Sequence, residues 1–131
     1  MIMQERKSMN NPKTKPVKEF RLLSKARYLY SLTIKITSHS PKKYRYNYVH
    51  VLQELSFNIW DNIFSANEYR ETPSEAIQYL KEAKISIAKM TDLMDLAHID
   101  QCISLREETE LGELLGEIQI IFDGWSKLFE K

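Results

Sequence analysis

Three sets of side chains in this sequence have the types and spacings that support chemistry. Asp95 and His98 are three positions apart, which is the spacing of a metal-binding pair on one helix face. A di-metal site in a helical bundle needs two such pairs and further carboxylates, and the chain has one pair. Cys102 is the only cysteine, so it forms no internal disulfide, and no spaced histidine pair accompanies it to bind zinc. We therefore predict no metal and no cofactor.

Arg45 and His50 form the third set, with four residues between them. Helical ribonucleases of the HEPN type use such a pair to cleave RNA. With six arginines and three histidines in the chain, this spacing arises readily by chance. The pair also begins a predicted helix instead of lying late in the fold. A ribonuclease is therefore a weak hypothesis, less favoured than the two non-enzymatic ones given below. We predict that the protein is not an enzyme.

Charge is distributed unevenly along the chain, although the net charge is +1. Up to His50 there are twelve Lys and Arg against two acids, and from Val51 onward there are seven against sixteen. Such asymmetry indicates either a basic surface for a polyanion or two halves that attract each other, within one subunit or between subunits. The candidate nucleic-acid contacts lie on one predicted helix face (Lys18, Arg21, Lys25 and Lys35) and at the corner that follows it (Lys42, Lys43 and Arg45).

Apolar residues recur every three or four positions, which predicts amphipathic helices and no strands. After a flexible basic arm over residues 1–16, helices are expected at 17–37, 43–69 and 73–97, followed by one that opens at Asp100 or Ser104 and contains an apolar stripe over 111–129. Short turns between long helices make neighbours antiparallel. The prediction is an all-α fold, an antiparallel up-down-up-down four-helix bundle over residues 17–131.

Finer features of these helices are also predicted. In the first helix, Phe20, Leu23, Tyr30 and Ile34 are expected to share one apolar sector, with Leu22, Ala26, Leu29 and Ile36 beside it. Capping boxes are expected where Thr72 precedes Glu75 and where Ser104 precedes Glu107. All three glycines fall in the last helix, where Gly112 and Gly116 are expected to let a neighbouring backbone approach closely.

The composition is that of a soluble globular domain, with 43% hydrophobic and 28% charged residues. No apolar run is long enough to cross a bilayer, and residues 1–18 lack the apolar core of a signal peptide. A single cysteine fits a reducing compartment, so the expected location is cytoplasmic. Phe57, Trp60 and Phe64 flank the apolar stripe of the second helix, which predicts a homo-oligomer.

Two blocks of the sequence resemble a known family. Pro41-Lys42-Lys43-Tyr44-Arg45-Tyr46 continues without gaps to Ala66-Asn67, and Leu114-Leu115-Gly116-Glu117-Ile118 precedes Gly124-Trp125-Ser126-Lys127. Both blocks are similar to the accessory variability determinant (Avd) proteins of diversity-generating retroelements and to the related bundle proteins encoded in ribosomal RNA intervening sequences. The chain departs from the family at Gln119-Ile120 and Asp123, and in its acidic second half.

The resemblance implies a non-enzymatic four-helix bundle that assembles into a ring-like pentamer. It further implies binding to a reverse transcriptase and its template RNA. By matching position, Arg45 and Tyr46 form the corner that opens the second helix, while Gly124, Trp125 and Lys127 form a closing motif. The alternative is a structural or interaction bundle that binds no nucleic acid.

Overall fold

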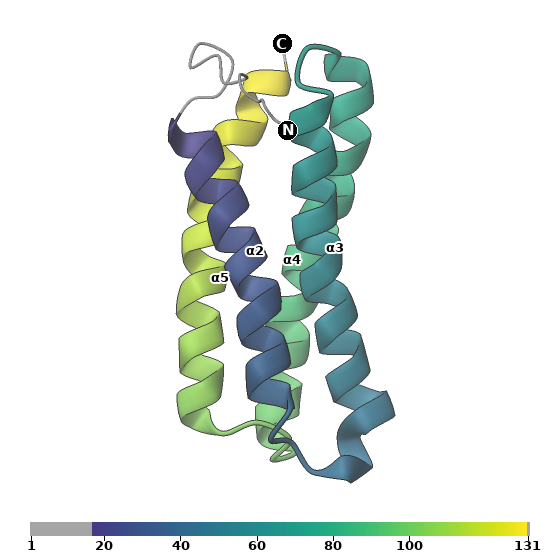
Figure 1. Cartoon of the computed structure of the whole chain (residues 1–131), viewed down its shortest axis with the longest axis vertical. Coiled ribbons are helices and arrows are strands. Elements are labelled where there is room, and N and C mark those ends of the chain that lie inside the picture. The colour runs from purple at the N-terminus through teal and green to yellow at the C-terminus, as the bar shows by residue number, and fades with distance from the viewer. Residues whose placement is uncertain (1–16, 131) are drawn as a thin grey trace, which may run out of the picture.

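A computed structural model describes the backbone of residues 17–130 and the side chains of residues 21–130. Four long helices form a bundle (Figure 1), namely α2 (Val17–Thr37), α3 (His50–Glu68), α4 (Pro73–Ile99) and α5 (Leu105–Ser126). The predicted all-α four-helix bundle is confirmed, whereas the expected arm over residues 1–16 lies outside the described residues. None of the helices within residues 17–130 is long and apolar enough to span a membrane.

Successive helices run in opposite directions along the bundle, as the colour order in Figure 1 shows. Each helix contacts the next one in the chain, and α5 returns to lie against α2. The α2–α3 and α4–α5 connections therefore lie at the same end of the bundle, and the α3–α4 connection lies at the other (Figure 1). This topology brings the basic corner after α2 beside the turn that follows Ile99.

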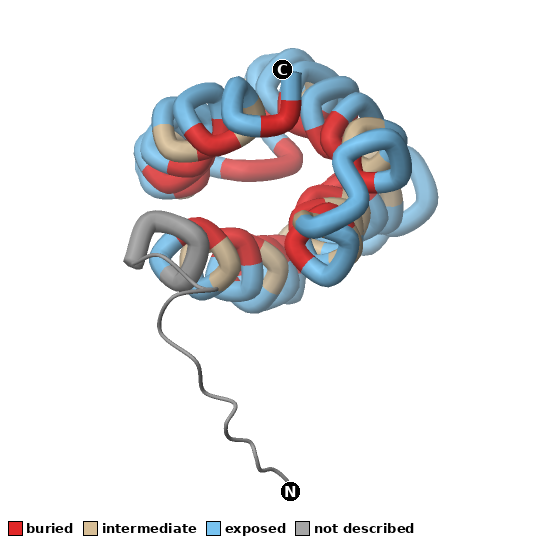
Figure 2. The backbone as a smooth tube through the Cα atoms, turned by 90° about the horizontal axis from the view of Figure 1, so that it is seen from above, coloured by how far each residue is buried: buried red, intermediate tan, exposed pale blue. Residues whose placement is uncertain are grey.

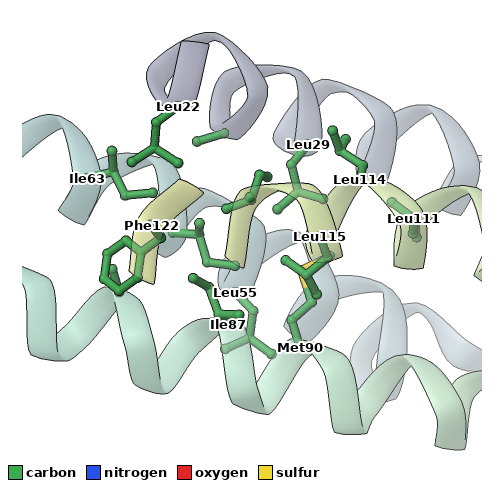
Figure 3. Packing of buried hydrophobic residues seen from close by; sticks show 14 of the residues in the cluster. Leu22, Leu29, Leu55, Ile63, Ile87, Met90, Leu111, Leu114, Leu115 and Phe122 are labelled. Carbon is green, nitrogen blue, oxygen red and sulfur yellow. The ribbon is translucent and has the colours of Figure 1, made fainter. Parts of the chain in front are cut away.

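One hydrophobic core fills the space between the four helices. Seen along the bundle, buried positions line its inner side (Figure 2). Leu22 of α2, Ile63 of α3 and Phe122 of α5 lie close together in this core, and Met90 of α4 lies farther along it beside Leu115, each at most 2% exposed (Figure 3). Each such side chain contributes roughly 1.5–3 kcal/mol when it is removed from water. Burial of these stripes, more than helix propensity, holds the helices together.

The core face of α2 contains the predicted apolar residues Leu22, Ala26, Leu29 and Ile36, and it is rotated away from the sector predicted at Leu23, Tyr30 and Ile34. Leu23 and Tyr30 are half-buried at its flank and Ile34 is 39% exposed, while the side chain of Phe20 lies outside the described residues. Thr33 is fully buried because its hydroxyl donates to the carbonyl of Leu29 at 2.7 Å. The observed core face includes two threonines that a purely apolar count leaves out (Leu22, Ala26, Leu29, Leu32, Thr33, Ile36 and Thr37).

Of the two predicted capping boxes, one is present. Ser104 Oγ accepts the Glu107 N–H at 3.1 Å, and Glu107 Oε1 accepts the Ser104 N–H at 2.8 Å. Thr72 does precede Pro73 at the start of α4, but its side chain makes no capping hydrogen bond, so that box was wrongly predicted. The ψ angle of Thr72 is 77°, whereas Ser104 has the extended ψ of 165° that brings a hydroxyl over the first turn.

The glycines of α5 do not mark a close helix contact. Gly112 is half-buried and Gly116 is exposed. A Cβ added to either residue meets no atom within 4 Å, so the predicted close approach of a neighbouring backbone is wrong. The reason is positional, because the core face of α5 is formed by larger residues on the same helix (Leu111, Leu114, Leu115, Ile118, Phe122 and Trp125).

Candidate nucleic-acid interface

The predicted contacts on α2 do not all face solvent. Arg21 and Lys35 are exposed, and the side chain of Lys18 lies outside the described residues. Lys25 Nζ lies 3.0 Å from Glu117 Oε1 on α5, with the two side chains 33% and 57% exposed. Lys25 therefore joins α2 to α5, and part of the charge asymmetry along the sequence is used within the fold.

Two residues on α2 extend this basic surface beyond the prediction. Arg27 is exposed, but the predicted set omits it because it lies on a different side of the helix from the other cations. Tyr28 follows Arg21 by seven positions, so it shares that face, and it is 54% exposed. An exposed tyrosine at helical spacing from Arg21 is the sequence signal that was overlooked.

The segment between α2 and α3, residues 38–49, is referred to here as the corner, and it contains two short helical turns. Lys42–Tyr44 forms a 3₁₀ turn (η2), and Arg45–Val49 forms a π-helical turn (η3) that closes with the His50 N–H donating to the Arg45 carbonyl. The α-helix thus starts at His50, not at Lys43 as the sequence predicted. A π turn holds about one residue more than an α turn, and such turns occur frequently at functional sites.

Two tyrosines fix this corner against the α4–α5 turn. The Tyr44 hydroxyl donates to the Asp100 carbonyl, and the Tyr48 hydroxyl donates to the Asp100 carboxylate. Their ring centroids are 5.6 Å apart. Ser40 Oγ also donates to the Cys102 carbonyl at 2.8 Å. Three hydrogen bonds between distant parts of the chain therefore give the corner a defined position.

Two groups in this region have raised pKa values, for different reasons. The hydrogen bond to the Asp100 carboxylate raises the pKa of Tyr48 from 10.0 to about 12. Burial raises the pKa of the Cys102 thiol, which is 3% exposed. A protonated, buried thiol is a poor nucleophile.

The outer side of the corner carries three cations and an exposed aromatic ring. Lys42, Lys43 and Arg45 are all exposed, and Tyr46 is 80% exposed. Lys43 Nζ lies 5.1 Å from the centre of the Tyr44 ring. Residues 21–50 include seven Lys and Arg and no Asp or Glu. The surface that residues 21–50 form on α2 and the corner therefore carries a strong positive charge.

The other candidate chemistry is not brought together into a cleft. Arg45 and His50 are both exposed, and neither lines the cavity of about 190 Å³ that lies between α4 and α5. His98 Nδ1 lies 3.4 Å from the Ile103 carbonyl, where the ring sits against the α4–α5 turn. Within residues 17–130, no three His, Cys, Asp or Glu side chains are grouped to hold a metal ion.

Five of the seven predicted contacts are exposed on α2 and the corner: Arg21, Lys35, Lys42, Lys43 and Arg45. Of the other two, Lys25 is in an ion pair and the side chain of Lys18 is not described. No protein-family model matches the sequence, and no curated protein matches it.

Proposed function

We propose that the protein is a non-enzymatic RNA-binding bundle whose contact surface is α2 together with the corner. The observation that carries this proposal is the run of exposed cations in residues 21–50, a region without a carboxylate. Lys and Arg on such a surface bind phosphates and release counterions, which favours nucleic-acid binding with little sequence preference. The resemblance to Avd proteins extends the proposal to a reverse transcriptase as protein partner and its template RNA as ligand.

The competing explanation is that the basic first half neutralises the acidic second half inside the bundle. Among the side chains of residues 21–130, one ion pair joins the two halves, and it is Lys25–Glu117. The exposure of the other cations of α2 and the corner supports contact with a polyanion outside the bundle. This favours RNA binding over a bundle that uses its charges only for its own folding.

Charge reversal tests the proposal most directly when Lys25 is left unchanged. Reversing Lys25 would place two carboxylates across the α2–α5 contact and mix a folding effect with a binding effect. The test variant therefore carries Arg21→Glu, Lys35→Glu, Lys42→Glu and Arg45→Glu. Its matched control also reverses four charges, with Lys81→Glu, Lys84→Glu, Lys89→Glu and Lys127→Glu at exposed positions outside α2 and the corner.

Fluorescence anisotropy with a labelled RNA at increasing salt measures the outcome. We expect the test variant to lose most of its affinity, and the slope of log affinity against log salt to fall by about 0.7–0.9 for each phosphate contact removed. The control variant should bind like the wild type. Equal losses in both variants would show that total charge matters and the surface does not, and unchanged binding by the test variant would contradict the proposed interface.

A second proposal concerns self-association, and it depends on a different surface. The Tyr30 ring of α2 lies 5.6 Å from Phe57 and 6.0 Å from Trp60 of α3, measured between centroids. Phe57 is 41% exposed and Phe64 is 51% exposed. We refer to Tyr30, Ile34, Phe57, Trp60 and Phe64 as the aromatic face. We propose that a second copy of the chain covers it in a homo-oligomer, for which the family resemblance implies a pentamer.

A further inference from the structure

The side chain of Tyr46 is highly exposed, and phosphate binding by the neighbouring cations does not explain why an aromatic ring stands there. At 80%, it is more exposed than any other large hydrophobic side chain in residues 21–130. Its ring contributes nothing to the core, and phosphate contacts at the corner need only Lys42, Lys43 and Arg45. The question is what an ordered, exposed phenol contributes to a basic surface.

The neighbours of Tyr46 determine where its ring points. Tyr44 and Tyr48 lie two positions before it and two positions after it, and both donate hydrogen bonds to Asp100. Side chains two positions apart on a helical turn point to opposite sides. The same bonds that hold Tyr44 and Tyr48 against the α4–α5 turn therefore hold Tyr46 on the outside of the corner.

Cations surround this outward ring along the chain. Arg45 directly precedes Tyr46, Lys42 lies four positions before it, and all three side chains are exposed. An aromatic ring among cations is the combination by which proteins bind single strands without reading their sequence, because each base stacks on a ring while the cations follow the backbone. Paired bases in a duplex are stacked on one another and offer no free face.

We propose that Tyr46 is a base-stacking residue, and that the corner binds unpaired nucleotides of an RNA strand while Lys42 and Arg45 contact the adjacent phosphates. The inference rests on the proposed RNA binding and adds the form of RNA that this surface selects. It also assigns separate roles to two parts of the surface. The corner distinguishes single strands from duplex, and the α2 cations add affinity for either form.

Two substitutions of Tyr46 in the full chain test the inference against two RNA probes. The probes are a labelled short oligouridine, which forms no internal pairs, and a labelled blunt RNA duplex. Tyr46→Ala should lower affinity for oligouridine roughly 5- to 100-fold and leave affinity for the duplex unchanged. Tyr46→Phe keeps the ring and should bind both probes like the wild type. Tyr69→Ala is the control, because it removes another exposed tyrosine ring that lies just after α3, outside both the corner and the aromatic face.

Each outcome of this experiment decides a different point. If Tyr46→Ala binds oligouridine as tightly as the wild type, stacking is wrong and the proposed RNA binding still stands. Parallel losses of oligouridine and duplex in Tyr46→Ala would also overturn the inference, because they would indicate a disturbed corner. A wild-type protein that binds neither probe would overturn the proposed function itself. An equal loss with Tyr69→Ala would remove the assignment to Tyr46.

Discussion

The pKa of Tyr48 is raised, and its hydrogen bond to Asp100 is the largest cause. Its hydroxyl donates to the Asp100 carboxylate, which raises the pKa of Tyr48 from 10.0 to about 12. A raised pKa in the folded state means that folding favours the neutral phenol. The stability that Tyr48 contributes is therefore complete below pH 10 and is lost as the pH rises from 10 to about 12.

We predict that Tyr48→Phe removes this pH dependence. In an alkaline titration followed by ultraviolet absorbance, the wild type should form one phenolate late, near pH 12, and the variant should lack that step. Chemical denaturation should show a larger loss of stability between pH 10 and pH 12 for the wild type than for the variant. Superimposable curves for the two proteins would contradict the Tyr48–Asp100 bond.

For single residues, the sequence predicts which side chains are exposed better than it predicts which residues they contact. Helical spacing and charge correctly place Arg21 and Lys35 in solvent. The partners of Lys25 and Tyr48 are 92 and 52 positions away in the chain. Contacts at such separations depend on how helices are rotated against one another, which periodicity alone does not determine.

The starts of α4 and α5 provide a matched test of helix capping. Ser104 and Thr72 both stand at the N-cap position, but only Ser104 bonds to the first turn of its helix through its side chain. We predict that Ser104→Ala lowers the free energy of unfolding by about 1 kcal/mol. Thr72→Ala should change it by only a few tenths, at most ~0.5 kcal/mol, as is typical of surface substitutions. Urea denaturation of both variants measures the difference.

Comparing the two stability losses shows whether the capping motif in the sequence or the hydrogen bonds in the structure determine the stabilisation. Both sites have Ser or Thr followed three residues later by Glu, so a rule based on sequence alone expects equal losses. Equal losses in the two variants would contradict the difference in geometry between Thr72 and Ser104. Glu107→Gln serves as a further control, because its amide oxygen can still accept the Ser104 N–H.

The sequence predicts helix bounds more accurately than helix faces. The bounds of α2 agree with the prediction at both ends, and those of α4 agree within two residues. The core face of α2 was misplaced because Thr33 and Thr37 are buried, with their hydroxyls bonded to the backbone one turn earlier. The start of α3 was misplaced because the π turn at Arg45–Val49 has no residue pattern that distinguishes it from an α-helix.

For the whole molecule, four apolar stripes joined by short turns were sufficient to predict a four-helix bundle. The sequence also placed most of the cations in one region, because charge asymmetry is visible without coordinates. It did not show that the corner is fixed by Asp100, or that the tyrosines beside Tyr46 face inward. Those features depend on the two turns lying at the same end of the bundle, which is a property of the assembled topology.

The aromatic face leads to a prediction about the mass of the protein in solution. Large exposed apolar patches commonly mark protein–protein contacts. Analytical ultracentrifugation at micromolar concentration should therefore give a mass several times the 15.5 kDa of one chain. Phe57→Ser with Phe64→Ser should shift the mass toward that of the monomer, because these side chains are 41% and 51% exposed on the aromatic face.

A matched substitution on another helix locates the contact. Ile120→Ser with Leu128→Ser removes two exposed apolar side chains at the C-terminal end of the chain, 75% and 66% exposed, and should leave the mass unchanged. If this variant dissociates instead, assembly uses the α5 side and the aromatic face has another role. A wild type that sediments at 15.5 kDa would exclude self-association through either surface under these conditions. The charge-reversed variant of α2 and the corner should keep the wild-type mass, because the proposed RNA surface and the aromatic face consist of different residues.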